Sequence, residues 1–479
     1  MLETKIKEND GPEEAVRVRA PGPWRVEFKA LLALGVPMGL TQLVQFSINT
    51  VDVLMIGRLG PEALAAAALG LVIFYLFFML ALGPAMALSP LVSQTLGANA
   101  KNFDEVRLSV RMGLWVAALI LPCSVGISLV AENIALFLGQ KPELAARAGP
   151  YVMALAPGLP FMIGVVMLRN FLAAIGRTRW PLVFIVGTTF LNGFLNWLLI
   201  YGNWGFPRLE LVGAGIASSI SHAAGFFMLV AFCEVDACAA EFRIFKDALR
   251  PHWERFREIL RLGWPIGVSV AFEALLFNAC VFLMGLIGVG EVAAYQVALN
   301  VAATAFMMPL GLAMAGGVRV GLHQGAGDLA GVRRAALLTI LASIAVMALF
   351  WIPVMISPSF IAGLYLEADD TANAAVLALV ASFLPIAAAF GFFDATQVAA
   401  MNGLRGLKDV RFPMILTGVS YWPIGFALAL YLGLFTELGA VGVWWGLLAG
   451  LFAASVSLSA RLWLLVRAPN PSDSRSARP

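Results

Sequence analysis

Twelve long apolar stretches follow one another along this chain, separated by short charged or glycine-containing connections. Each stretch has about 20 residues or more, which is the length that a helix needs to cross the hydrocarbon core of a bilayer. Each must hydrogen-bond its own backbone in that environment, and a helix does so within a single segment. We therefore expect twelve transmembrane helices, over residues 31–56, 66–93, 108–131, 149–172, 180–202, 211–233, 259–287, 292–318, 335–360, 373–401, 411–434 and 440–466.

The composition excludes most other classes of protein. Of the 479 residues 60% are hydrophobic and 13% are charged, and this charged share is roughly half that of an average soluble domain. Such apolar content excludes a disordered chain, and four cysteines are too few for a disulfide scaffold. A net charge of +3 gives no reason to expect nucleic acid as a partner. The sequence predicts an all-α, multi-pass protein of the lipid bilayer.

The distribution of basic residues predicts the orientation. Placing both termini and the even-numbered connections in the cytoplasm puts all but four of the 32 Lys and Arg on that side; the four are Arg58, Lys141, Arg147 and Arg208. Cytoplasmic loops are the ones that carry excess positive charge. The first 28 residues are charged and contain no apolar run, so we expect no cleaved signal and expect the first helix to direct insertion.

The second half of the chain repeats features of the first half. Leu34-Gly35-Val36-Pro37 recurs as Leu262-Gly263-Trp264-Pro265, and VSQTLGA at 92–98 recurs as VGLHQGA at 320–326. Each repeat holds six spans, so both insert in the same direction, as in some secondary transporters. We expect two pseudo-symmetric six-helix lobes, with an N-terminal tail at 1–28, an N-lobe at 29–233, a cytoplasmic linker at 234–258, a C-lobe at 259–466 and a C-terminal tail at 467–479. The basic, amphipathic linker is expected to form a helix on the membrane surface.

Three acidic residues lie well inside predicted spans: Asp52, Glu273 and Asp394. No Lys or Arg is expected at a comparable depth. An ionised acid inside the membrane costs roughly 3 kcal/mol on insertion scales, so unpaired acids indicate a wet cavity or a pathway for a cation or a proton. The alternative is an acid that neighbouring amides satisfy in a packed bundle.

Polar residues recur at helical spacing near these acids. Gln42, Gln45, Asn49 and Asp52 share one side of the first span, Asn192 and Asn196 are four apart in the fifth, and Asp394 and Gln397 share a face of the tenth. Amide and carboxylate oxygens suit a hard cation such as Na⁺. The alternative for the two asparagines is hydrogen bonding between helices.

Other chemistry is missing from the sequence. The three histidines are scattered, with no cysteine at a zinc-binding distance, and no glycine-rich phosphate-binding motif is present. We therefore expect no enzyme activity and no cofactor other than a coupling ion.

Residues from about 30 to 466 resemble the multidrug and toxic compound extrusion (MATE) family, specifically its bacterial NorM branch. The resemblance is carried by Val51-Asp52 with Met55 and Gly57, by Gly263-Trp264-Pro265 with Phe272-Glu273, and by the segment FDATQVAAMNGLRGLKD at 393–409. It implies a fold of twelve helices in two six-helix lobes.

The resemblance also implies roles for single residues. Asp52 matches the acid of the N-lobe cation site, Asn192 and Asn196 match its partners, and Ser218 matches a hydroxyl position beside them. Glu273 and Asp394 match the C-lobe pair that is linked to cation and drug binding. The resemblance therefore implies a Na⁺ site either at Asp52, Asn192 and Asn196 or at Glu273 and Asp394. The chain departs from archaeal-type members, because Asn196 stands where they carry a second acid.

The implied function is secondary active multidrug efflux. Organic cations would leave by antiport with Na⁺ or H⁺ through alternating access of the lobes, with the acid pattern favouring Na⁺. We expect a monomer in the bacterial inner membrane that confers antibiotic resistance. The alternatives are a lipid-linked glycan flippase, whose anionic substrate would want deep Arg or Lys, an integral membrane enzyme, or a channel.

Overall fold

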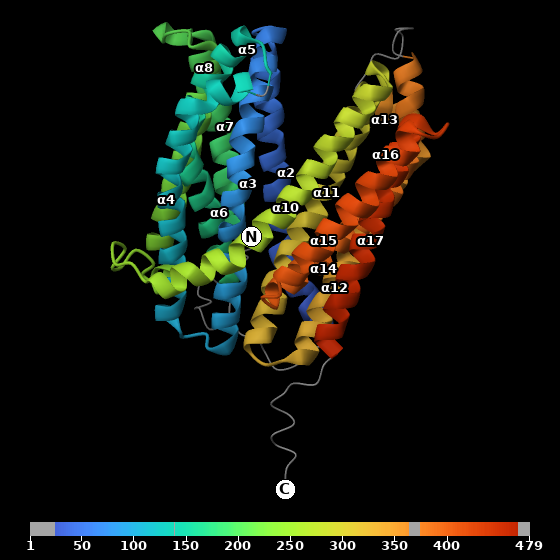
Figure 1. Ribbon diagram of the computed structural model, residues 1–479. Helices are drawn as coiled ribbons and strands as arrows, with labels where there is room; N and C mark the ends of the chain where they lie inside the picture. Colours follow the sequence, from blue (N-terminus) through green and yellow to red (C-terminus); the bar gives the residue numbers. More distant parts are fainter. Residues whose placement is uncertain (1–23, 138, 364–373, 468–479) are drawn as a thin grey trace, which may run out of the picture. The chain divides into compact units, whose positions relative to one another are not determined.

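The computed structural model describes residues 24–137, 139–363 and 374–467, and nearly all of this part of the chain is helical (Figure 1). The longer helices are α2 (Trp24–Gly57), α3 (Pro61–Ala98), α4 (Phe103–Phe137), α5 (Pro142–Leu155), α6 (Gly158–Ala174), α7 (Arg179–Tyr201), α8 (Glu210–Val235), α10 (Trp253–Ile287), α11 (Val289–Gly325), α12 (Leu329–Ile356), α14 (Ala374–Gly406) and α17 (Gly439–Arg467). Shorter elements are η1 (Asn203–Gly205), α9 (Ala237–Ala240), α13 (Pro358–Gly363), α15 (Arg411–Val419), η2 (Ser420–Phe426) and α16 (Ala427–Leu434). Most of the two expected tails lies outside the described residues.

These helices account for all twelve predicted spans. Ten helical stretches are long and apolar enough to cross a membrane, counting Arg411–Leu434 as one of them. The apolar helices α5 and α6 meet at a 46° bend at Ala156–Pro157, because proline lacks the N–H that would continue the helical hydrogen bonding. Together they cover the predicted span at 149–172 and count as the eleventh. The 38-residue apolar helix α3 is the twelfth. The expectation of an all-α, multi-pass membrane protein is confirmed.

The chain forms two compact units. Unit 1 contains residues 36–271, and unit 2 contains residues 24–35 together with the described residues from 272 onward. The helices α2 and α10 are therefore each divided between units, after Gly35 and after Ala271. The expected lobes assigned 29–35 to the N-lobe and 259–271 to the C-lobe, so the units depart from them at these two helix segments.

Glycine positions explain why these two segments pack where they do. A Cβ atom placed on Gly35 would lie 2.6 Å from Leu312 on α11, and one placed on Gly263 would lie 2.4 Å from the Cα atom of Pro84 on α3. The neighbour of Gly263 is backbone, which cannot yield, so this position needs a residue without a side chain. At Gly35 the nearest atom is Cδ2 of Leu312, a movable side-chain end, and the Leu312 Cα atom follows at 3.2 Å, so the two helices lie close together there as well. The repeated Leu-Gly-x-Pro motif thus marks the places where the first halves of α2 and α10 pack against α11 and α3.

The expected surface helix in the linker is wrong. The structure shows only the short α9 there, followed by turns in which Arg243 and Asp247 have φ angles of 45° and 57°. Side chains with a Cβ atom rarely adopt this conformation within a helix. Helix α10 starts at Trp253, so Arg255 and Arg257 at the end of the predicted linker belong to it.

Contacts with α4 stabilise this folded linker. The Phe242 ring is fully buried, with centroids 4.9 Å from Phe103 and 5.3 Å from Phe171. Arg107 Nε donates to the Phe242 carbonyl (2.8 Å), and Trp115 Nε1 donates to the Ala248 carbonyl (2.8 Å). Burying a large ring and hydrogen-bonding the free backbone carbonyls stabilise the turns. These contacts favour the turns over the surface helix that the amphipathic pattern predicted.

A π-helical segment interrupts the eleventh span. This segment, η2, contains Pro423, which lacks the N–H that a regular helix would use. Such segments are frequent at functional sites. It carries Tyr421, which is 1% exposed and whose hydroxyl has no hydrogen-bond partner among the described residues.

Candidate functional site

The first polar cluster lies in unit 1, around Asp52 on α2. Asn196 on α7 donates from Nδ2 to Asp52 Oδ1 (2.5 Å) and to Asn192 Oδ1 (3.2 Å). Ser218 on α8 donates from Oγ to Asp52 Oδ2 (3.4 Å) and accepts from Asn192 Nδ2 (3.4 Å). The structure therefore brings together all four residues to which the resemblance assigned the N-lobe site.

One atom in this cluster has no partner. Asn196 is fully buried, and its Oδ1 accepts no hydrogen bond from the described residues. A buried acceptor without a partner is unfavourable and calls for an explanation such as a bound ion or water. Carboxylate, amide and hydroxyl oxygens are hard ligands of the kind that bind alkali and alkaline-earth cations. The set is therefore suited to a small cation or to a proton on Asp52.

Among the other predicted polar residues of α2, Gln42 lies away from this cluster, whereas Asn49 hydrogen-bonds Tyr75, which interacts electrostatically with Asp52. Gln42 lies ten residues before Asp52, or about 15 Å along the helix, and its Oε1 accepts from Arg169 Nη2 on α6 (2.6 Å). Gln45 is half-buried and Asn49 is exposed. The polar face that helical spacing predicted is thus divided between an arginine contact and the acid cluster.

The second polar cluster lies in unit 2 and joins α10 to α14. Gln397 donates from Nε2 to Glu273 Oε1 (3.2 Å) and to Asp394 Oδ1 (3.1 Å). Asp394 is 5% exposed and Gln397 is 2% exposed. One amide group therefore links two acids. Helical spacing predicted that Asp394 and Gln397 share a face, and the family resemblance implied the pairing of Glu273 with Asp394.

Sequence reasoning missed a buried base that interacts with one of these acids, Glu273. Arg405 on α14 is 8% exposed and interacts electrostatically with Glu273 and with Tyr421. Its Nε has no hydrogen-bond partner among the described residues. Arg405 lies in the last turn of α14, about 16 Å along the helix from Asp394. The expectation that no Lys or Arg lies at the depth of the acids therefore stays a prediction, and what sequence reasoning missed is the burial of this helix end. Helical periodicity could have indicated this burial, because Arg405 lies on the same face of the helix as Asp394, about three turns later.

The described part of the chain contains no group of side chains suited to a zinc-type metal site. No group of three or more His, Cys, Asp or Glu residues is placed there to hold a metal ion. The two clusters instead combine carboxylates with amides in the interior of membrane-spanning helices. This arrangement can exchange one cation for another, or a cation for a proton, without covalent chemistry.

Comparison with known proteins gives the family. The MatE family model matches residues 37–198 and 265–431, which is more than half of the chain. The chain belongs to the MATE family. This MATE protein is 40% identical to "Probable multidrug resistance protein NorM" of Rhizobium meliloti, covering 95% of this chain and 97% of that protein. A protein of the same name from Mesorhizobium japonicum is 38% identical, covering 93% and 96%.

Solved structures show the same fold. A MATE crystal structure in complex with MaD3S has a TM-score of 0.85 and 20% identity, covering 96% of this chain and 98% of that one. The eukaryotic MATE transporter AtDTX14 has a TM-score of 0.82 and 21% identity, covering 95% and 99%. The fold of the MATE protein is therefore the twelve-helix, two-lobe fold expected from the sequence. Members of this family are transporters and not enzymes, as the sequence also predicted.

Proposed function

We propose that this MATE protein is a secondary active multidrug efflux transporter, which exports organic cations by antiport with Na⁺ or H⁺ through alternating access. The observation that carries the proposal is the pair of clusters in which Asp52, Glu273 and Asp394 are held by amides inside membrane-spanning helices. Its relatives named as multidrug resistance proteins support the choice of drugs as substrates.

The proposed exchange follows from charge. A carboxylate in a low-dielectric site attracts an organic cation strongly, because little water screens the charge. Entry of Na⁺ or H⁺ from outside neutralises the acid and weakens its hold on the drug, which leaves. A one-for-one exchange of a monovalent coupling cation for a monovalent organic cation moves no net charge, so the concentration gradient of the coupling ion drives the export. The membrane potential adds about 2.3 kcal/mol per 100 mV only for each coupling cation beyond one per drug molecule.

Arg405 is a reason to consider the lipid-linked glycan flippase again, because a buried base could bind the phosphate of an anionic lipid. Its neighbourhood argues against that function. With Glu273 and Asp394 ionised, the three residues carry one net negative charge, which favours cations over an anionic lipid. Export of cations therefore remains the proposed activity.

The test is transport in proteoliposomes with ethidium, a permanently charged organic cation, as the probe. We expect an imposed Na⁺ or H⁺ gradient to drive ethidium against its own gradient, and the ion whose gradient suffices is the coupling ion. Asp52→Asn should uncouple the protein, so that imposed gradients lose most of their effect on ethidium flux while the folded yield is unchanged. Ethidium movement that ignores both gradients in the wild-type protein would contradict antiport. Wild-type coupling in Asp52→Asn would remove Asp52 from the mechanism.

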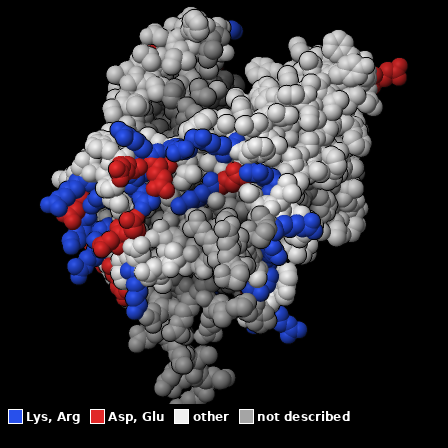
Figure 2. All heavy atoms as spheres, turned by 60° about the horizontal axis from the view of Figure 1, so that its bottom comes forward, with Lys and Arg blue, Asp and Glu red and all other residues white. Residues whose placement is uncertain are grey.

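We further propose a monomer in the bacterial inner membrane with both termini in the cytoplasm. Figure 2 shows charged side chains gathered over one part of the visible face, with little charge elsewhere on it. Among the basic residues of the linker and the start of α10 are Arg243, Lys246, Arg250, Arg255 and Arg257. Cytoplasmic loops are enriched in Lys and Arg, and this bias counts the bases even where acids accompany them, as Glu234, Asp236, Glu241, Asp247, Glu254 and Glu258 do here.

Reporter fusions test this orientation. A reporter that is active only in the periplasm should be inactive when fused after Asp247 or at the C-terminus. It should be active when inserted into the connection at 203–209, between α7 and α8. An active fusion after Asp247 would contradict the proposed topology, because it would require either an odd number of spans before the linker or a periplasmic N-terminus.

A further inference from the structure

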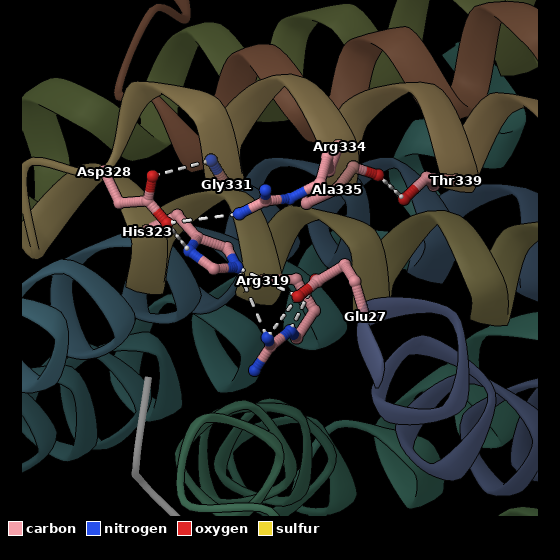
Figure 3. Close-up of polar contacts among 8 residues, drawn as sticks. All are labelled: Glu27, Arg319, His323, Asp328, Gly331, Arg334, Ala335 and Thr339. Atoms are coloured by element: carbon pink, nitrogen blue, oxygen red, sulfur yellow. Dashed lines mark hydrogen bonds and ion pairs between the residues drawn. The ribbon is translucent and has the colours of Figure 1, made fainter. Parts of the chain in front are cut away.

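A buried charge network holds the first turn of α2 in unit 2 (Figure 3). Arg319 on α11 binds Glu27 in a bidentate pair, with Nε to Oε1 at 2.8 Å and Nη2 to Oε2 at 2.6 Å. His323, one turn further along α11, places Nε2 at 3.0 Å from Glu27 Oε2 and at 3.3 Å from Arg319 Nη2. Glu27 is 5% exposed and His323 is 3% exposed. Bidentate arginine–carboxylate pairs fix orientation as well as distance.

The network continues to the start of α12. His323 Nδ1 lies 3.1 Å from Asp328 Oδ2, and Arg334 Nη2 lies 3.6 Å from the same oxygen. Asp328 also caps α12, because its Oδ1 accepts from the Gly331 backbone N–H (2.8 Å). A Cβ atom on Gly331 would lie 2.1 Å from His323 Nδ1. A glycine is thus needed where the helix cap meets the histidine ring.

Glu27 lies on a helix that is shared by the two units. Residues 24–35 of α2 belong to unit 2, whereas the rest of α2, with Asp52, belongs to unit 1. The same helix therefore connects a charge network in one unit to the acid of the polar cluster in the other. Any change in the arrangement of the units must either keep this attachment and bend α2, or release it.

The other divided helix, α10, is held in a corresponding way, but with a base instead of an acid in its first turn. The repeat offset that aligns Gly35 with Gly263 also aligns Glu27 with Arg255, in the first turn of α10. Arg255 binds Glu105 on α4 and donates to Glu258 Oε2 (2.7 Å), all within unit 1. An acid at the start of one divided helix and a base at the start of the other each bind opposite charges in the unit to which that segment belongs.

We propose that Glu27, Arg319 and His323 form a latch that holds the start of α2 on unit 2, and that the strength of this latch sets the balance between arrangements of the two units. Arg255 and Glu105 form the corresponding latch at α10. The consequence for transport rests on the proposed alternating access, but the balance itself is measurable without a drug or an ion gradient.

Distances between spin labels test the latch in the full-length protein in lipid nanodiscs. Labels at Arg208→Cys in unit 1 and Glu437→Cys in unit 2 occupy exposed connections, in a background where the exposed Cys123 is replaced by Ser. If the wild-type protein shows two distance populations, we expect Glu27→Gln to change their ratio at least about threefold. If it shows one, we expect a second population to appear in the variant. The charge swap Glu27→Arg with Arg319→Glu should return the distribution toward wild type.

Two further variants keep the test decisive. Lys29→Gln, an exposed residue on the same segment, is the matched control and should leave the distribution unchanged. Asp328→Asn keeps a capping side chain but removes a charge facing His323, so it should shift the distribution less than Glu27→Gln does. It also reports on the latch if Glu27→Gln does not fold. A wild-type distribution in both Glu27→Gln and Asp328→Asn, or an unreversed shift in the charge swap, would overturn the latch. If these variants shift the distance distribution as expected but the wild-type protein does not transport ethidium, the latch stands and only the proposed function is contradicted.

Discussion

Glu273→Gln and Asp394→Asn should each reduce gradient-driven ethidium efflux at least about tenfold while leaving the yield of folded protein unchanged. The amides keep the volume of the side chains and can still pair with Gln397, but they remove the charge that attracts a cation. A hydrogen bond or contact to a charged group contributes about 1.5–3 kcal/mol, and each 1.4 kcal/mol corresponds to about a tenfold change in affinity. Initial efflux rates in proteoliposomes give the direct measurement.

Thermal stability separates a transport role from a packing role. Asp394 is buried and shares a single amide donor with Glu273, so removing one charge should leave the melting temperature unchanged or raise it. Glu132→Gln, at an exposed acid on α4, is the matched control and should alter neither quantity. Normal efflux combined with raised stability in both acid variants would show that the acids do not take part in exchange.

Local patterns in the sequence predicted the helices and the acid clusters well. Hydrophobic length decides whether a segment crosses a membrane, so the spans could be read from composition alone. Asn192 and Asn196 lie on one face because they are one turn apart, and Asp394 and Gln397 share a face for the same reason. The choice of Asp52 as their neighbour came from the family resemblance, since spacing along one helix does not say which other helix packs against it.

The contacts that the sequence did not predict all depend on distant parts of the chain. The linker turns are stabilised by a pocket for Phe242 that α4 and α6 build. Glu27 meets Arg319 because the first part of α2 packs on α11, with Gly35 at a close approach between the two helices. Arg405 was assigned to a helix end because hydropathy falls there, yet packing buries it. Hydropathy reports the average environment of a segment and not the partner of a single side chain.

Arg405→Gln should abolish most ethidium efflux and also lower the melting temperature, which distinguishes it from the acid variants. Its guanidinium is the buried positive charge that interacts with Glu273. Removing one member of a buried set of charges leaves the others uncompensated, which typically costs about 3–5 kcal/mol. Differential scanning fluorimetry and efflux on the same purified samples measure both effects. Arg461→Gln is the matched control, because the Arg461–Asp409 pair is more exposed (31% and 19%) and should contribute only about 0–1 kcal/mol.

A second substitution tests whether charge balance is the cause. Adding Glu273→Gln to Arg405→Gln returns the site from two net negative charges to the single net negative charge of the wild type, with Asp394 as the remaining acid, so the double variant should regain much of the lost stability. A double-mutant cycle measures this coupling directly. Efflux should not return, because Glu273→Gln alone already removes most of it. Additive losses of stability in the double variant would mean that Arg405 and Glu273 act independently. In that case Arg405 would stabilise the packing of α14 alone, and the net charge of the unit 2 site would be set by Glu273 and Asp394 without it.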